Sequence, residues 1–432
     1  MKKNLLFLIL FGVFIQIFLS CKREESLPPV ITMEKPLSGS LFEVGDSIFF
    51  QCRITSETTI EYAEIAIYSN SGPTSGTSLF YRPSGLSAVI SGYYPIDDFT
   101  LVSGEYYLHC NVKSDGKIST GSVKIRINGI PPKPLGLIAI NKVSSLSTNI
   151  YHIDSAGNPQ LWTTIYGDFF DARIDNLYQQ LYFFPLKNGE MQAIDLYTKR
   201  TKWSLSPGSS PSQQWFRGIE LIDNRLYVGD YGSNITVYSH DKSILQVMEA
   251  LPFYTAKHFL RINSFTLYYQ KPLRSGDHNR ILVYNMGMNL VQNMIFDHEL
   301  IKWYEKDDNT VYLFYNTENG FEIAYLSYYM AGINVLRTIN GQTLNDVEQL
   351  SDGQFLLATQ EGIWSYRPFS GHGITMLNAK GNVTVLEKNE NLTHVAAVSG
   401  RELFFIEMPL GNTINSVMLP YEIEKIFWHM DK

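Results

Sequence analysis

The chain is poor in charged residues, and those it has do not cluster by sign. Asp, Glu, Lys and Arg together make up 18% of its 432 residues, and the formal net charge is -7 at pH 7. Nucleic-acid-binding domains carry a dense stripe of Lys and Arg that neutralises phosphates, and the sequence contains no such stripe. We therefore expect no nucleic-acid partner.

Long apolar stretches are missing beyond the first twenty residues. No later segment approaches the roughly 18 uninterrupted apolar residues that a membrane-spanning helix needs, which excludes a protein with several spans. The one long stretch, "NLLFLILFGVFIQIFLS", follows Lys2 and Lys3 at the N-terminus. A basic start and an apolar run of this length are typical of a signal-peptide core or of a marginal membrane span.

Cysteine is scarce, and the first of the three cysteines has a distinctive setting. The small Ser20 precedes Cys21, and the hydrophilic "KREES" follows it. The stretch resembles a bacterial lipoprotein signal, in which the cysteine becomes the lipid-modified first residue of the mature chain. The continuation resembles the acidic export signal of Bacteroidetes surface lipoproteins. The stretch departs from these patterns at Phe18, where Leu is typical, at Leu19, where a small residue is typical, and at Arg23, which interrupts the acidic run.

The resemblance implies a signal peptide at residues 1–20 and a tether at residues 21–27. It also implies attachment to a membrane through a lipid on Cys21, at the outer membrane of a cell envelope and exposed at the surface. An ordinary secretory signal and a single-span anchor are the alternatives. In each case the mature chain works outside the cytoplasm.

The composition favours β-structure. The sequence contains 27 Tyr and 25 Phe, and its low charge content argues against a helix-rich or a disordered chain. Aromatic residues, together with Val, Ile and Thr, suit the pleated, half-buried surface of a β-sheet. We therefore expect an all-β protein of two or three domains.

The first folded segment is expected at residues 28–129, followed by a linker at residues 130–135. Cys52 and Cys110 each lie on the apolar side of an alternating run, "SIFFQCRI" and "EYYLHCNV". The segment resembles an immunoglobulin-like sandwich, although it lacks a Trp on its third strand and has Leu108 in place of the corner Tyr. An even pair of cysteines in an oxidising compartment predicts one disulfide, and two buried free thiols are the alternative.

The segment from residue 136 to residue 432 is expected to form a β-propeller. One pattern recurs about every 40 residues, most clearly in the copies that begin "LIDNRLYVGD", "EKDDNTVYLF" and "LSDGQFLLAT". Each unit has four antiparallel strands separated by polar turns and a Gly-containing hairpin, which is the pattern of a propeller blade. A blade exposes two apolar faces, so it is stable only when it packs between neighbours in a ring.

Counting the units predicts seven blades. Six complete units fit between about residues 170 and 419, with three strands left before them and one strand, "EIEKIFWHM", left after them. The last strand resembles the first strands of the other units. The leftover strands therefore combine into a seventh blade that is shared by both ends of the domain and closes the ring.

The repeat resembles the broad family of quinoprotein-like and YVTN-like propellers. In "MQAIDLYTKRTKWSL", Asp195, Thr198 and Trp203 match the pattern that follows a strand in such repeats, with Lys199 or Arg200 where Gly is usual. The Gly-His and Trp-Asp pairs of WD40 repeats are absent from the sequence.

Sequence motifs for catalysis, metal binding and cofactor binding are missing. The nine histidines are scattered, and there is no nucleophile elbow, phosphate-binding loop or calcium loop. A quinone cofactor needs a dense polar pocket with several basic groups, which the sequence does not assemble. We therefore expect no cofactor, no metal and no catalytic residues, although propeller enzymes do gather their residues from different blades.

The loops that enter the inner strands and the middle hairpins of the blades converge on one face of a propeller. The segments expected there are aromatic with a few Arg and His side chains, which suits stacking on sugars or on apolar side chains. Those segments contain Phe170, Asp171, Trp215 to Arg217, Phe253 to His258, His298, Trp303, Trp428 and His429. The candidate ligand contacts among them are Trp215, Phe216, Arg217, Tyr254, His258, Trp303 and Trp428. Packing between blades is the alternative role for each.

These features predict a non-enzymatic binding or adhesion protein of the cell envelope. It would have a lipid anchor, an immunoglobulin-like stalk and a propeller head that recognises a glycan or a protein. A propeller lyase or hydrolase acting on polysaccharide is one alternative. A scaffold subunit of an envelope complex is the other.

Overall fold

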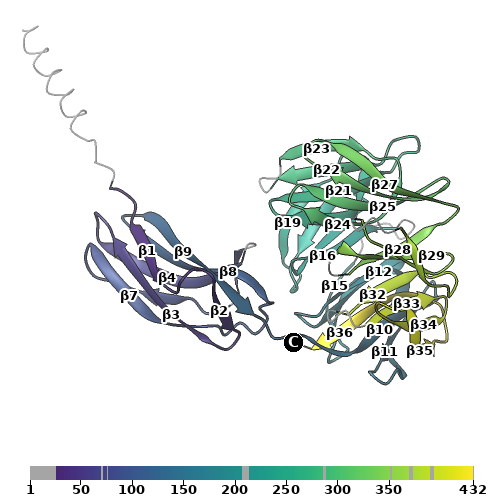
Figure 1. Ribbon diagram of the computed structural model, residues 1–432, viewed down its shortest axis with the longest axis horizontal. Coiled ribbons are helices and arrows are strands. Elements are labelled where there is room, and N and C mark those ends of the chain that lie inside the picture. Colours follow the sequence, from purple (N-terminus) through teal and green to yellow (C-terminus); the bar gives the residue numbers. More distant parts are fainter. Residues whose placement is uncertain are drawn as a thin grey trace, which may run out of the picture. The chain divides into compact units, whose positions relative to one another are not determined.

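The computed structural model describes residues 26–431 except residues 70–71, 75, 207–213, 286–288, 351–352, 369–372 and 390–393. The described chain is built of β-strands, which confirms the predicted fold class (Figure 1). Within it, no helix is long and apolar enough to cross a membrane. The signal peptide and the lipid site expected at Cys21 lie outside the described residues.

The chain forms two compact units that divide between Pro131 and Pro132, inside the segment expected as a linker. The first strand of the second unit, β10(Lys133–Ser144), begins at Lys133, earlier than the propeller start expected at residue 136. The reason is that Lys133 and Pro134 already pair with Asp431 and Met430 near the C-terminus.

The first unit is a sandwich of two sheets with the strand order of an immunoglobulin-like fold. One sheet has the order β1(Val30–Lys35), β3(Ser47–Thr55), β7(Ser87–Pro95). The other has the order β2(Ser40–Glu43), β9(Lys117–Asn128), β8(Gly104–Ser114), β4(Ile60–Ser69), β5(Gly72–Pro73), with β6(Leu79–Tyr81) paired to β4. β2 runs parallel to β9, whereas the other pairs are antiparallel.

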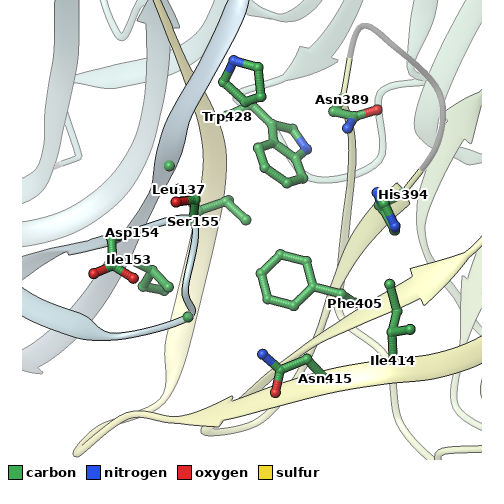
Figure 2. Close-up of a pocket in the computed structure, with 13 residues that line it drawn as sticks. Leu137, Ile153, Asp154, Ser155, Asn389, His394, Phe405, Ile414, Asn415 and Trp428 are labelled. Atoms are coloured by element: carbon green, nitrogen blue, oxygen red, sulfur yellow. The ribbon is translucent and has the colours of Figure 1, made fainter.

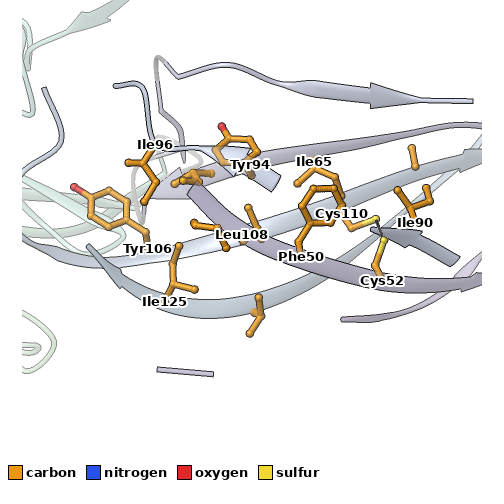
Figure 3. Packing of buried hydrophobic residues seen from close by; sticks show 14 of the residues in the cluster. Phe50, Cys52, Ile65, Ile90, Tyr94, Ile96, Tyr106, Leu108, Cys110 and Ile125 are labelled. Atoms are coloured by element: carbon orange, nitrogen blue, oxygen red, sulfur yellow. Dashed lines mark hydrogen bonds between the residues drawn. The ribbon is translucent and has the colours of Figure 1, made fainter. Parts of the chain in front are cut away.

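Cys52 and Cys110 lie in the core between these sheets, as their alternating runs predict. Both side chains are fully buried, and their Sγ atoms are 3.3 Å apart as free thiols (Figure 3). The hydrogen bond to Cys52 and burial raise the pKa of Cys110. The contact shows that β3 and β8 face each other, whereas a disulfide between the two residues stays a prediction.

A tyrosine near the start of β8 anchors one corner of this unit. The hydroxyl of Tyr106 donates a hydrogen bond of 2.8 Å to the Val102 carbonyl, four residues upstream. This is the bond of the tyrosine corner in immunoglobulin-like domains. Leu108 occupies the usual position of the corner Tyr, as the sequence shows, and the bond is made here by Tyr106, two residues earlier on the same strand.

The second unit is a ring of seven four-stranded antiparallel blades, which confirms the predicted propeller and its blade count. Blade 1 comprises residues 167–175 of β12(Pro159–Asp175), with β13(Gln180–Gly189), β14(Met191–Asp195) and β15(Thr201–Leu205). Blade 2 comprises β16(Phe216–Ile222), β17(Arg225–Asp230), β18(Asn234–Tyr238) and β19(Ile244–Glu249). Blade 3 comprises β20(Tyr254–Ile262), β21(Phe265–Pro272), β22(Arg280–Asn285) and β23(Leu290–Ile295). Blade 4 comprises β24(Glu299–Asp307), β25(Thr310–Thr317), β26(Gly320–Ser327) and β27(Gly332–Asn340). Blade 5 comprises β28(Leu344–Gln349), β29(Phe355–Thr359), β30(Ile363–Tyr366) and β31(Thr375–Asn378).

Blades 6 and 7 bring the two ends of this unit together (Figure 1). Blade 6 comprises β32(Val385–Lys388), β33(His394–Ser399), β34(Glu402–Glu407) and β35(Asn412–Met418). Blade 7 comprises the C-terminal β36(Ile423–Asp431), then β10, β11(Ser147–Ile153) and residues 159–166 of β12. The last strand of the chain is thus the inner strand of a blade whose other strands come first, as its sequence predicts.

β12 serves two blades, and Gly167 marks the change between them. Residues 159–166 pair with β11, whereas residues 167–175 pair with β13. Gly167 has a φ of 144°, and a Cβ atom there would lie 2.7 Å from the carbonyl oxygen of Asn188. The strand therefore needs a glycine where it passes from one blade to the next.

Apolar cores join each blade to its neighbours. Successive side chains of a strand point to opposite faces, so Leu313 packs between blades 3 and 4 and Phe314 packs between blades 4 and 5. The described residues of this unit form seven such clusters, one for each junction of the ring. Burial of both faces of every blade is the main stabilising term of this unit.

Polar side chains of the inner strands, and of the turn that follows β16, also connect neighbouring blades at every junction. Three of these contacts are short ion pairs, at 3.0 Å for Arg173–Glu220, 3.1 Å for Arg261–Asp223 and 2.9 Å for Lys257–Glu299. The others are Lys302–Asp346, Lys388–Glu348, Lys425–Asp171 and the Trp428 indole with the Glu387 carbonyl. The centre of the propeller is therefore held by charged groups as well as by apolar packing.

Candidate functional site

The inner strands all begin on one side of the ring and end on the other. We call the side on which they begin, at residues such as Phe216, Tyr254 and Glu299, the top face. The side on which they end, at residues such as Ile222 and Ile262, is the bottom face. These two faces are the surfaces on which side chains from different blades meet.

Phe253 is the most unusual residue of the top face. Its φ is 67°, a left-handed conformation that bulky residues rarely adopt. The Leu273 amide donates to the Phe253 carbonyl at 2.7 Å, and the Tyr254 amide donates to the Leu251 carbonyl at 2.9 Å. The turn is thus held from both sides, and it leaves the Phe253 ring 50% exposed. A held turn in a rare conformation that displays an aromatic ring points to a functional surface.

Arginine side chains lie against the aromatic rings of this turn. The Cζ atom of Arg274 lies 3.5 Å from the ring centroid of Phe253. The Cζ atom of Arg280 lies 5.8 Å from the ring centroid of Tyr254, and its Nε donates to the Tyr254 hydroxyl at 3.2 Å. Such cation–π contacts orient both partners, so the guanidinium groups are presented in defined positions.

A third pair of this kind comes from the neighbouring blade. The Cζ atom of Arg217 lies 5.2 Å from the ring centroid of Tyr231, and the Tyr231 amide donates to the Trp215 carbonyl at 2.8 Å. The Nε of Arg217 is buried without a hydrogen-bond partner among the described residues, and burial lowers the pKa of its guanidinium. We call the three pairs the top-face cluster: Arg217, Tyr231, Phe253, Tyr254, Arg274 and Arg280.

An open cleft of about 760 Å³ lies over blade 4 on the same face. Its lining is acidic and polar, with Asp297, Glu299 and Glu322 among its residues. Lys271 and Lys257 contact Glu299 at 2.8 and 2.9 Å, and these hydrogen bonds lower the pKa of that carboxyl to about 2. The top face therefore has mixed charge, with arginines over blades 2 and 3 and carboxylates over blade 4.

The structure gives packing roles to several of the predicted ligand contacts. Phe216 is 1% exposed and lies 5.5 Å from Phe184, ring centroid to ring centroid, in the core between blades 1 and 2. Trp303 is 5% exposed, and its Nε1 donates to the Phe259 carbonyl at 3.2 Å. Trp215 is half-buried against the same core as Phe216. These three predicted residues therefore pack in or against the cores between blades, and the top face is formed by other residues of the chain.

His258 lies on the inner strand of blade 3. Its Nε2 is buried, with no hydrogen-bond partner in the described part of the chain, and burial lowers the pKa of the imidazole to about 3. The ring is therefore neutral at pH 7. The same strand carries Lys257, which forms the ion pair to blade 4.

Trp428 does not join the other predicted residues, and the expectation that they share one face was wrong for it. It lies near the end of β36, and its carbonyl accepts a hydrogen bond of 3.0 Å from Asn176, in the turn after β12 ends. Both positions belong to the bottom face. His429, the next residue, accordingly contacts Gln179 of the same turn at 3.1 Å.

A pocket of about 350 Å³ opens beside Trp428 on the bottom face, between blades 6 and 7. Figure 2 shows the rings of Trp428 and Phe405 turned toward the same space, with Ile414 and Asn415 from β35 on one side. Asp154 and Ser155, in the loop after β11, lie on the other side. The pocket thus combines an aromatic wall with a polar rim.

Sequence reasoning missed most of these residues for physical reasons. Arg274 and Arg280 lie in and after a hairpin, where no periodicity marks them. Phe405 and Asn415 come close to Trp428 only because the ring closes between the two ends of the unit. The lone signal in the sequence is the arginine-containing hairpin "KPLRSGDHNR", which is longer than the corresponding hairpins of the other blades.

The described residues contain no group of three His, Cys, Asp or Glu side chains that would hold a metal ion. The chain matches no protein-family model and none of the curated proteins. Among solved structures it is similar to a quinoprotein alcohol dehydrogenase-like protein of Bacteroides thetaiotaomicron, at 13% identity and a TM-score of 0.45 over 92% of this chain and 99% of that one.

Two further solved structures are similar to parts of the chain. The dihydro-heme d1 dehydrogenase NirN matches at 10% identity and a TM-score of 0.48, over 69% of this chain and 76% of that one. BamB of Moraxella catarrhalis matches at 14% identity and a TM-score of 0.40, over 67% of this chain and 85% of that one. The likeness is one of fold. The β-propeller of this chain is established by its own strand pairing, and its function rests on its own residues.

Proposed function

We propose that the protein is a lipid-anchored binding protein of the cell envelope, and that the top face of its propeller binds a partner protein without converting it. The observation that carries this proposal is the top-face cluster, in which three arginines lie against aromatic rings and one of these rings, that of Phe253, is half exposed. Arg and aromatic residues are the types that dominate the binding energy of protein interfaces.

The shape and charge of the face support a protein partner. The cleft over blade 4 is open, and the face carries arginines and carboxylates side by side across blades 2 to 4. A mixed-charge surface of this kind suits a complementary protein surface, because opposite charges select the partner and fix its orientation. Rings and guanidinium groups already held by cation–π contacts lose little conformational entropy on binding.

The lipid anchor is proposed from the sequence around Cys21. Lipidation predicts that the wild-type protein partitions with membranes, whereas Cys21→Ala stays with its signal peptide or is found in the soluble fraction. Fractionation and mass spectrometry of the mature N-terminus test this step independently of partner binding.

The binding role is tested by capture from a detergent extract of the envelope, using a soluble form of the mature chain that starts at Lys22 and so lacks the lipid-modified Cys21. We expect the wild type to retain a discrete protein that the Phe253→Ala/Arg274→Ala variant loses. Tyr329→Ala is the matched control, because Tyr329 is also 50% exposed but follows β26 on the bottom face. Capture by the cluster variant at the wild-type level would contradict the proposal, as would bond cleavage in the captured partner by the purified wild type.

A further inference from the structure

The pocket between blades 6 and 7 is a second candidate site, on the opposite face from the top-face cluster. It opens where the apolar core of this junction reaches the bottom face, and Phe405 and Trp428 are the half-buried members of that core. Its volume of about 350 Å³ lies in the range of small-molecule sites. Its walls come from both ends of the propeller, so the pocket exists only in the closed ring.

The aromatic wall is held in place from behind. The Nε1 of Trp428 donates to the Glu387 carbonyl at 3.3 Å, and the ring centroids of Trp428 and Phe405 are 6.1 Å apart at an interplanar angle of 52°. Because the indole N–H is already bonded, the groups that the two residues offer to the pocket are their ring surfaces. Such surfaces stack on the C–H faces of a sugar ring or on an apolar side chain.

The rim of the pocket is polar, and hydrogen bonds fix its position as well. The Asp154 carboxylate accepts hydrogen bonds from the amides of Ala156 and Asn158, at 3.0 and 2.9 Å, and these bonds lower the pKa of its carboxyl. Asn415 and His394 bring further hydrogen-bonding groups to the same opening. Gly157 allows the rim to close up, because a Cβ atom there would lie 3.0 Å from the Asn415 Nδ2.

The charge of the pocket narrows the ligand class. Among the described residues that line it, none is Lys or Arg, and Asp154 is the one carboxylate. An anionic ligand would meet a negative charge with no Lys or Arg among the described lining residues to offset it, so acidic sugars and phosphates are disfavoured. An apolar peptide side chain would bury the polar rim without giving it hydrogen-bond partners, which costs free energy.

We propose that this pocket binds a neutral sugar residue of a glycan, with the ring of the sugar against Trp428 and Phe405 and its hydroxyl groups toward Asp154, His394 and Asn415. This function goes beyond the proposed protein partner, because it uses a different face and a different chemistry. A protein with both sites would link a glycan to an envelope protein.

A glycan array that contains neutral and acidic oligosaccharides, probed with the mature chain, tests the proposal, and calorimetry on the best ligand follows. We expect neutral glycans to bind, Asn415→Ala to weaken binding by about tenfold while the thermal midpoint stays near that of the wild type, and Trp428→Phe to weaken binding as well. Met418→Ala is the matched control on the same strand as Asn415, since Met418 is 62% exposed and does not line the pocket. It should bind as the wild type does.

Several results would overturn the inference. They are an array without neutral ligands, binding that Asn415→Ala leaves unchanged, preference for acidic glycans, and competition by apolar peptides without any glycan binding. The Phe253→Ala/Arg274→Ala variant separates this site from the proposed function, because it should lose the partner protein and keep the glycan.

Discussion

Trp303 shows how a bulky residue of an inner strand contributes to the ring. The side chain is 5% exposed, lies in the core between blades 3 and 4, and donates its indole N–H to the Phe259 carbonyl of the neighbouring inner strand. The sequence places it in a segment expected to reach the ligand face, with packing as the alternative. Its contacts in the structure are those of a packing residue.

Replacing Trp303 should therefore cost stability rather than affinity. We expect Trp303→Ala to lower the free energy of unfolding by about 3–5 kcal/mol, because it removes a large buried side chain and leaves the Phe259 carbonyl without its donor. Chemical denaturation of the mature chain measures this change. A variant that keeps wild-type stability but loses partner binding would show that Trp303 contacts the ligand instead.

His429 makes the stability depend on pH. Its side chain is 5% exposed, its ring centroid lies 5.6 Å from that of His152, and burial lowers the pKa of its imidazole to about 4. In the unfolded chain a His has a pKa of about 6.5, so the unfolded state takes up the proton first as the pH falls. The free energy of unfolding should therefore decrease between about pH 6.5 and pH 4, and this contribution is fully present above that window.

His429→Gln should flatten this part of the pH profile. Glutamine keeps a polar group near Gln179 but cannot take up a proton, so the decrease with falling pH should become smaller. A slope remains from His152, whose pKa burial also lowers. His278→Gln is the control, because that side chain is 56% exposed. Equal slopes in wild type and His429→Gln, measured by denaturation at several pH values, would contradict this account.

At the scale of strands, periodicity and turns predict most of the architecture. Alternating apolar residues mark both sides of each blade, and Cys52 and Cys110 meet in the first unit because each lies on the buried side of its strand. Periodicity does not predict features that depend on a single backbone angle or on residues far away in the sequence. The local sequence does not show that Phe253 has a left-handed φ. It also does not show that Trp428, near the end of β36, lies at the bottom face rather than the top face.

The strand β36 is the element on which the closed ring depends most. It pairs with β10 from Lys133 to Asn141 and packs Ile426 and Phe427 into the cores on its two sides. A chain that stops at Glu422 would expose the edge of β10 and open two junctions. We expect it to lose the cooperative transition of the propeller in calorimetry and to aggregate on heating.

A suitable control for this truncation is Lys425→Gln in the full-length chain. It removes the ion pair with Asp171, at 3.5 Å, but keeps the strand and its apolar contacts, and Asp171 retains its ion pair with Arg173 at 2.8 Å. Its melting transition should stay cooperative. If the truncated chain melted like the wild type, β36 would not close the ring in the way described here.

At the scale of the whole molecule, the two faces of the propeller carry different chemistry. The top face has arginines on aromatic rings beside an acidic cleft, and the bottom face has a small aromatic pocket without a cation among its described lining residues. Together with the anchor expected at Cys21 and the immunoglobulin-like unit that follows it, these faces favour a protein that holds partners at the envelope over one that transforms them.

The affinity of the top face for its captured partner tests this account most directly. Biolayer interferometry with the purified partner should give a Kd for Phe253→Ala/Arg274→Ala at least about tenfold above that of the wild type, since two central hot-spot side chains are removed. Tyr329→Ala should bind as the wild type does. Equal Kd values for the wild type and the cluster variant, with both proteins folded, would contradict the central claim that the top face is the binding surface.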